Sequence, residues 1–190
     1  MAFDLRPCSL GVVATLCAAH HGYGSASSSS TYAFAVFEDA APVAAYAWQP
    51  PPPGCARAVA PESPSSVLAL SRMVAVPRVE RALRHVSKPL RRQMKTLIDR
   101  GRWPVLVTFS DEGQGHTGYV YQCSGWEKTA RSQARVYLDA DGRRVSPYAN
   151  GKLNGRDGVV FAGHTWIQRW EHWACPRGEA ARHMEKAGWS

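Results

Sequence analysis

The residues best suited to chemistry lie in one short segment, residues 110–126. This segment begins with Ser110 and holds a carboxylate at Asp111, an imidazole at His116 and a phenol at Tyr121. A carboxylate or an imidazole can accept a proton from a substrate, and a phenol can donate one to a leaving group. The segment therefore predicts a site of proton transfer.

Each of these side chains also has a structural interpretation. Asp111 stands where an apolar run ends and could cap the turn that follows. His116 could be a polar residue at the start of a helix, and Tyr121 could be a core tyrosine whose hydroxyl has a partner. These alternatives stay open at this point.

Arg72 is a charged residue inside the apolar run 67–76. A buried charge without a partner is costly. We therefore expect either an ion pair, with Asp111 as the candidate partner, or a group that holds substrate.

Positive charge is concentrated in one stretch. The chain carries a net charge of +8, and residues 72–104 hold ten basic residues against two acidic ones. A field of this kind favours a polyanionic partner such as nucleic acid. The candidates for holding a phosphate at the start of the basic helix are Arg84, Ser87, Lys88, Arg91 and Arg92.

The elements that must position these residues alternate between helix and strand. Apolar periodicity predicts a first helix over 10–19 with Ser9 as its N-cap, and a β-hairpin from 32–37 and 43–48. The proline-rich stretch 50–64 is predicted to be a loop without strand or helix. Buried strands over 67–76 and 104–109 flank a basic helix whose N-cap is Ser87 and whose first turn holds Pro89. This order predicts an α+β fold with helices covering a sheet.

The C-terminal third gives weaker signals. An Asp-Gly turn at 139–142 predicts a hairpin over 136–145. Trp166, Trp170 and Trp173 have helical spacing, which favours packing of a helix against the sheet, with a base-stacking platform as the alternative.

Length and composition predict a single domain over residues 1–190, since 45% of the residues are apolar and 20% are charged. The five cysteines are widely spaced, which favours reduced thiols and a cytoplasmic location. The apolar segment 10–19 is too short to cross a bilayer, so we expect no membrane partner.

Two resemblances extend this prediction. Tyr121-Gln122-Cys123-Ser124-Gly125-Trp126 resembles the Tyr-x-x-x-Gly-aromatic signature of GNAT-type N-acyltransferases. A longer match, over about residues 67–127, is similar to the Mom family of phage DNA-modification proteins, which are themselves GNAT-like. It consists of Leu70-Ser71-Arg72-Met73, the basic helix, Ser110-Asp111, Gln114-Gly115-His116-Thr117-Gly118 and Tyr121.

The resemblance implies a GNAT-like mixed sheet flanked by helices, with residues 128–190 as a C-terminal extension. It also implies an enzyme of the bacterial host cytoplasm that attaches a carbamoylmethyl group to N6 of a flipped adenine in duplex DNA, protecting it from restriction. In this assignment Asp111 accepts the proton or orients the amine, Tyr121 protonates the leaving group and Arg72 neutralises developing charge. Ser110 and His116 complete the site.

The donor stays open. GNAT proteins hold the pyrophosphate of acetyl-coenzyme A with a glycine-rich loop, and Arg84-His85-Val86-Ser87-Lys88 contains no glycine. Acetyl-coenzyme A, a related acyl donor, and iron or another metal held by His20, His21 and Asp111 are the candidates. An ordinary N-acetyltransferase acting on a small amine or a protein, and a non-catalytic DNA-binding protein, are the alternative functions.

Overall fold

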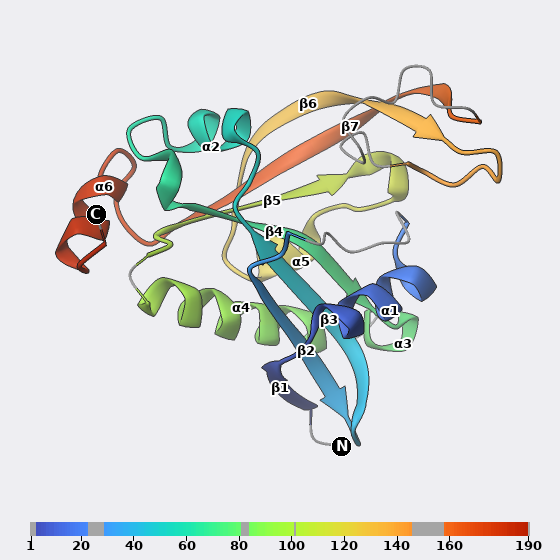
Figure 1. Cartoon of the computed structure of the whole chain (residues 1–190), viewed down its shortest axis with the longest axis horizontal. Helices are drawn as coiled ribbons and strands as arrows, with labels where there is room; N and C mark the ends of the chain where they lie inside the picture. Colours follow the sequence, from blue (N-terminus) through green and yellow to red (C-terminus); the bar gives the residue numbers. More distant parts are fainter. Residues whose placement is uncertain (1–2, 23–28, 81–83, 101, 146–157, 190) are drawn as a thin grey trace.

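The computed structural model describes residues 3–22, 29–80, 84–100, 102–145 and 158–189. Seven strands in this part of the chain form one sheet in the order β1-β2-β3-β4-β5-β7-β6 (Figure 1). The strands are β1 (Phe3–Pro7), β2 (Tyr32–Glu38), β3 (Ala41–Gln49), β4 (Val67–Ala75), β5 (Val105–Asp111), β6 (Glu127–Leu138) and β7 (Val160–Trp173). The helices are α1 (Leu10–His20), α2 (Pro53–Val59), α3 (Pro77–Glu80), α4 (Arg84–Asp99), α5 (Tyr119–Cys123) and α6 (Ala180–Lys186). Short 3-10 turns, η1 (Pro64–Ser66) and η2 (Glu112–Gln114), complete the described elements.

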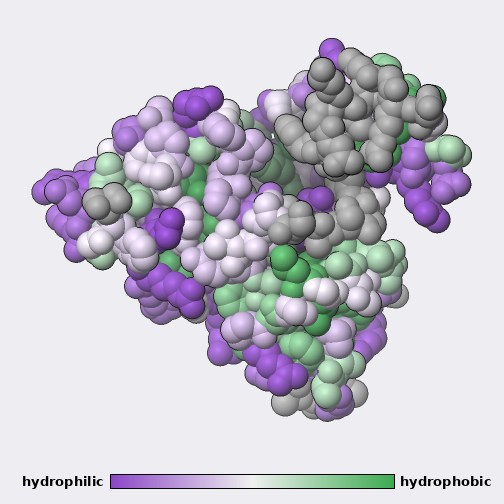
Figure 2. Space-filling model, in the orientation of Figure 1, coloured by the Kyte–Doolittle hydropathy of each residue, from purple (hydrophilic) through white to green (hydrophobic). Residues whose placement is uncertain are grey.

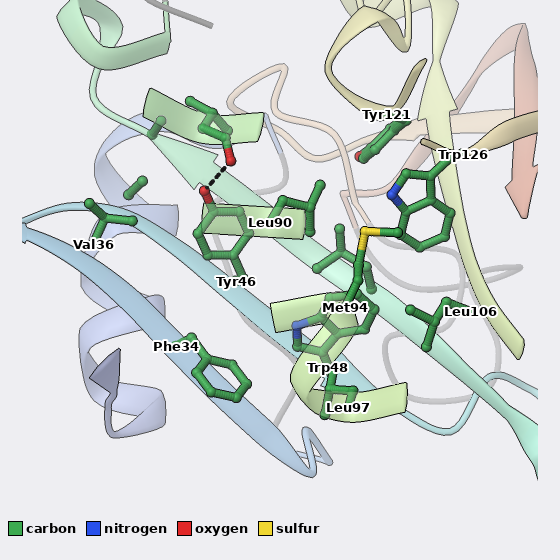
Figure 3. Packing of buried hydrophobic residues seen from close by; sticks show 14 of the residues in the cluster. Phe34, Val36, Tyr46, Trp48, Leu90, Met94, Leu97, Leu106, Tyr121 and Trp126 are labelled. Atoms are coloured by element: carbon green, nitrogen blue, oxygen red, sulfur yellow. Dashed lines mark hydrogen bonds between the residues drawn. The ribbon is translucent and has the colours of Figure 1, made fainter. Parts of the chain in front are cut away.

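Helices cover both faces of this mixed sheet, which confirms the predicted fold class. The α1 helix packs on one face through Val13, Leu16 and Cys17. The α4 helix packs on the opposite face through Leu90, Met94 and Leu97, as Figure 3 shows. The predicted first helix and the hairpin of β2 and β3 are both present.

The start of α4 differs from the prediction. The helix begins at Arg84 and not after Ser87, so Pro89 lies inside it rather than in its first turn. A proline there cannot donate to the carbonyl four residues earlier. Two hydroxyls anchor this end: Tyr46 donates to the Val86 carbonyl at 2.8 Å (dashed in Figure 3), and Ser124 donates to the Ser87 carbonyl at 3.4 Å.

The proline-rich stretch does contain a helix, so that prediction is wrong. Pro53 is the first residue of α2. A proline at this position loses no hydrogen bond, because the first N–H groups of a helix have no partner within it.

The C-terminal third completes the sheet. The β7 strand lies between β5 and β6, so residues 128–190 are more than an extension of the core. Trp166, Trp170 and Trp173 belong to β7, and their predicted helix is wrong because pairing with β6, with both neighbours and with β5, respectively, fixes an extended backbone. The tight turn predicted near Asp139 is present, and its carboxylate accepts from the backbone N–H groups of Asp141 and Arg143.

The feature that creates the site is the divergence of β4 from β5. The two parallel strands pair only over Val67–Ala69 and Val105–Val107. In the pairing of β3 with β4, Ala47 lies opposite Arg72 and Trp48 lies opposite Leu70, which leaves Ser71 as the extra residue of a bulge. A bulge bends its strand. Beyond this bulge β4 and β5 run in different directions (Figure 1).

Two global predictions can be compared directly with this structure. All five cysteines are thiols that form no disulfide. None of the described helices combines the length and the apolar character needed to cross a bilayer.

Candidate active site

The C-terminal end of α1 meets the ends of β4 and β5 at the divergence. Arg72 lies on β4, His21 follows α1, and His116 lies in the loop after β5. The side chain of Gln114 packs so tightly on Gly22 that a Cβ there would lie 2.8 Å from the Gln114 Cδ atom. The structure therefore brings the 110–121 segment against Gly22, the residue that follows His20 and His21.

The pKa of His21 is affected by both Arg72 and His116, so these three residues lie close to one another. Burial, and after it the positive charges of Arg72 and His116, together lower the pKa of the His21 imidazole to about 4. A histidine with such a pKa is neutral at pH 7. His21 therefore acts as a neutral donor or acceptor beside the Arg72 cation.

Asp111 is buried, and both of its carboxylate oxygens accept hydrogen bonds. One carboxylate oxygen accepts from the Gly113 N–H at 2.9 Å and from the Thr165 hydroxyl at 2.6 Å. The other accepts from the Arg144 guanidinium and, at 3.4 Å, from Gln114. The structural interpretation of Asp111 as the cap of the following turn is thus confirmed.

The ion pair of Asp111 is formed with Arg144 and not with Arg72, which corrects the pairing suggested by the sequence. The Arg72 guanidinium donates to the Ser71 carbonyl at 2.7 Å. The bulge at Ser71 turns Arg72 toward the α1 side of the sheet, where its positive charge acts to lower the pKa values of Cys17 and His21.

Ser110 on β5 and Tyr121 on α5 lie on the other side of the sheet, which α4 covers. Ser110 is buried and accepts from the Trp170 indole N–H at 2.9 Å. The Tyr121 ring packs between two tryptophans, with ring centroids 6.0 Å from both Trp126 and Trp170. Figure 3 shows Tyr121 and Trp126 together above α4.

The Tyr121 hydroxyl marks the point at which the strands separate. It is in hydrogen-bond contact with Thr108, whose own hydroxyl donates to the Leu70 carbonyl of β4 at 3.1 Å. Burial raises the pKa of the Tyr121 phenol, and the Thr108 contact offsets this in part. Tyr121 therefore stays protonated at neutral pH and keeps a proton to donate.

The basic helix presents a cationic outer surface. Lys88, Arg91 and Arg92 are exposed on α4, whereas Ser87 is buried. Arg84 is the first residue of the helix, and its side chain lies outside the described part of the chain. The structure therefore groups Lys88, Arg91 and Arg92 on one surface but does not present the Ser87 side chain there.

The described residues that follow β4, Pro77–Glu80, offer few N–H groups to the pyrophosphate of coenzyme A. Pro77 has no N–H group, and the N–H groups of Val79 and Glu80 both donate to the Val76 carbonyl. Close approach of a phosphate needs a row of unoccupied N–H groups and small residues.

The described residues also give no metal centre. No three His, Cys, Asp or Glu side chains in that part of the chain lie together as ligands would. His20 is exposed, and the oxygens of Asp111 already have partners. His20, His21 and Asp111 are therefore not arranged as a ligand set.

Three residues of the site were missed by sequence reasoning. Arg144 and Thr165 hold Asp111, and Thr108 contacts Tyr121. All three are common residue types in elements without a motif, and two come from the C-terminal third. Thr108 lies on β5 itself, the pairing of β7 with β5 brings Thr165 to Asp111, and Arg144 follows the turn after β6.

Solved structures with the same fold are N-acetyltransferases. The chain is similar to the ribosomal-protein-S18-alanine N-acetyltransferase from Escherichia coli, with a TM-score of 0.56, 11% identity, and coverage of 88% of this chain and 92% of that one. An N-acetyltransferase from Staphylococcus aureus Mu50 gives a TM-score of 0.56 at 11% identity, covering 92% of this chain and all of that one. The IAA acetyltransferase from Bacillus cereus ATCC 14579 gives 0.53 at 9% identity, covering 90% and 100%. These likenesses establish the GNAT fold.

Sequence comparison supplies the family. No curated protein matches this chain. The model of the Mom protein family, in contrast, matches residues 3–170, which include the divergence of β4 and β5, Tyr121 and the strand that carries Thr165 and Trp170. The chain belongs to the Mom protein family.

Proposed function

We propose that this protein is a transferase that attaches a carbamoylmethyl-type group to N6 of adenine in DNA, in the cytoplasm of a bacterial host, and so shields phage or prophage DNA from restriction. The family and the fold indicate a transferase. The observation that carries the finer proposal is that the Gln114–Gly118 string and Tyr121, which give the resemblance to Mom proteins, lie at the divergence of β4 and β5.

Tyr121 is assigned the acid in this proposal. Its phenol is protonated, and its position is fixed by Thr108, Trp126 and Trp170. A fixed donor at the reacting centre can protonate a leaving group without reorganisation.

The proton from the adenine amine is assigned to His116 rather than to Asp111. The N6 lone pair is delocalised into the ring, so the amine needs a base close by as its new bond forms. The Asp111 oxygens are occupied by Arg144, Thr165 and Gly113, whereas the His116 side chain is exposed in the loop that Asp111 holds. Asp111 is therefore a positioning residue, and Arg72 offsets negative charge that develops in the transition state.

The substrate must reach this buried site as an extruded base. An adenine stacked in a duplex cannot reach a tyrosine inside the protein, so the nucleotide has to be flipped out. The cationic surface formed by Lys88, Arg91 and Arg92 on α4 is suited to the phosphates on either side.

The proposal is tested by mass spectrometry of nucleosides from the DNA of bacteria that express the protein. Wild type should yield a new, heavier adenine nucleoside. Tyr121→Phe should reduce it by about 10²-fold or more, because a positioned proton donor is lost. Tyr119→Phe is the matched control: this tyrosine lies on the same helix but is 58% exposed, and its variant should match wild type.

The fold favours one competing function, a coenzyme A-dependent N-acetyltransferase acting on a small amine or a protein. Unmodified DNA from cells that contain folded wild-type protein, together with Tyr121-dependent acetylation of an amine, would establish that alternative. A protein that binds DNA and leaves both adenine and amines unchanged would instead be a non-catalytic binding protein.

A further inference from the structure

The β6 and β7 strands extend beyond the rest of the sheet as a two-stranded ribbon. The β5 strand pairs with β7 from Trp173 only as far as Ile167. From there to Val160, β7 pairs with β6 alone. The ribbon projects past the end of β5 in Figure 1, and Figure 2 shows hydrophilic side chains near its outer end.

One face of this ribbon carries alternating cations, amides and aromatic rings. Register pairs Gln133 with Trp166, Arg135 with His164 and Tyr137 with Phe161. We call the exposed members of this face the ribbon strip: Arg131, Gln133 and Arg135 on β6, with Phe161, His164 and Trp166 on β7.

The rings and cations of the ribbon strip contact one another. The Arg131 guanidinium lies 4.2 Å from the centroid of the Trp166 ring, and the Phe161 and His164 rings are 5.3 Å apart. Arg135 forms no ion pair within the described part of the chain, and Trp166 and Phe161 are 40% and 55% exposed. A single exposed aromatic needs no explanation, but this set of exposed rings beside arginines is the composition of a nucleic-acid surface.

The strip leads to the candidate active site. Trp166, Gln168 and Trp170 are alternate residues of β7 and so face the same side, where Trp170 touches Tyr121. Glu112 fixes the inner end, because it accepts from Arg131 at 2.9 Å and from Gln168 at 2.7 Å. On the opposite side of β7, Arg169 is bound to the buried Glu171 and is not part of the strip.

We infer that the ribbon strip binds duplex DNA beside the adenine that enters the site, an inference that rests on the proposed function. A two-stranded ribbon fits the major groove of B-DNA. From Phe161 to Trp166 the strip covers about 17 Å at roughly 3.3 Å per residue, which is about half a helical turn of DNA. Arg135 contacts a phosphate or a guanine, Gln133 contacts base edges, and Arg131, which is paired with Glu112, orients the Trp166 ring.

The test compares duplex binding by two double variants, measured by fluorescence anisotropy over a series of salt concentrations. Arg135→Gln with Trp166→Ala should bind about tenfold more weakly or worse, with a slope of log affinity against log salt that is shallower by about 0.9 for the lost phosphate contact. Arg57→Gln with Arg182→Gln, which removes exposed arginines from α2 and α6, is the control and should bind like wild type.

The outcomes separate this inference from the proposed function. If wild type modifies adenine and the strip variant binds duplex as tightly as the control, the strip inference alone is wrong. Loss of binding to single strands with unchanged binding to duplex would also overturn it. If wild type neither binds duplex nor modifies adenine, both proposals fail. An unchanged melting temperature confirms that the strip variant is folded.

Discussion

Replacing Gly118 by alanine tests whether the loop before α5 and the tryptophan of β7 hold Tyr121 in place. Gly118 has φ +73°, a conformation in which alanine costs about 1 to 2 kcal/mol. A Cβ at this position would also lie 2.7 Å from the Trp170 Nε1 atom and still closer to two ring carbons. The indole must move, and it then loses its hydrogen bond to Ser110.

The magnitude follows from these three effects. Backbone strain, overpacking of about 1 to 3 kcal/mol and loss of one hydrogen bond of about 0.5 to 1.5 kcal/mol sum to about 3 to 6 kcal/mol. For a chain of this size we expect Gly118→Ala to lower the melting temperature by about 6 to 24 °C. Because the Trp170 and Tyr121 rings are in contact, adenine modification should be lost as well.

Gly115→Ala is the matched control. Gly115 has nearly the same φ, +74°, but no atom lies within 4 Å of a Cβ built there. It should show the backbone strain alone, about 2 to 8 °C in melting temperature. Thermal unfolding followed by circular dichroism measures both variants. Equal melting temperatures for the two would refute the inference that contact with Trp170 fixes this loop.

The remaining predictions address charge and ligands. Asp111→Ala should lower the free energy of unfolding in urea by about 3 kcal/mol, because the half-buried Arg144 is left without its carboxylate; a loss near zero would contradict the positioning role. The pKa of His21 is lower in the folded state than its ordinary value of 6.5, so the unfolded chain takes up the proton first as pH falls. Stability should therefore drop between pH 6.5 and pH 4, by about 3 kcal/mol at most, and this drop should disappear in His21→Gln. Neutralising Arg91 and Arg92 together should weaken duplex binding and make its salt dependence shallower without changing the melting temperature; unchanged affinity would place the DNA contacts elsewhere. Calorimetry with acetyl-coenzyme A should detect weak binding or none, and low-micromolar binding would show that the connection after β4 holds its pyrophosphate after all.

The sequence was informative where local pattern and tertiary structure agree. The apolar helix before His21, the hairpin of β2 and β3, and the buried strands β4 and β5 have periodicities that suit their final environment, and the structure confirms them. The motif residues 110–121 could be read directly, because a resemblance needs no knowledge of packing. Only part of this segment lies with Arg72: His116 and Arg72 are both close to His21, whereas Ser110 and Tyr121 lie on the other side of the sheet.

The errors came from long-range pairing. Trp166 and Trp170 have a spacing of four, which places them on the same side of either a helix or a strand, so the pattern could not decide between the two. Asp111 was matched to Arg72 because both lie on neighbouring strands. The actual partner, Arg144, stands 33 residues further along, after a turn. No local signal connects such positions.

The insertion of β7 between β5 and β6 has a consequence for how the chain reaches its native state. Val105 pairs with Trp173 and Asp111 with Ile167, so the edge of β5 stays without its partner until the chain beyond residue 160 has been synthesised. Pairings between positions so distant in sequence are slow to form, and an uncovered strand edge can pair with another molecule. We therefore expect the pairing of β7 with β5 to be one of the last steps in the folding of this protein. A fragment that ends after Trp126 would expose the edge of β5 and associate instead of folding alone.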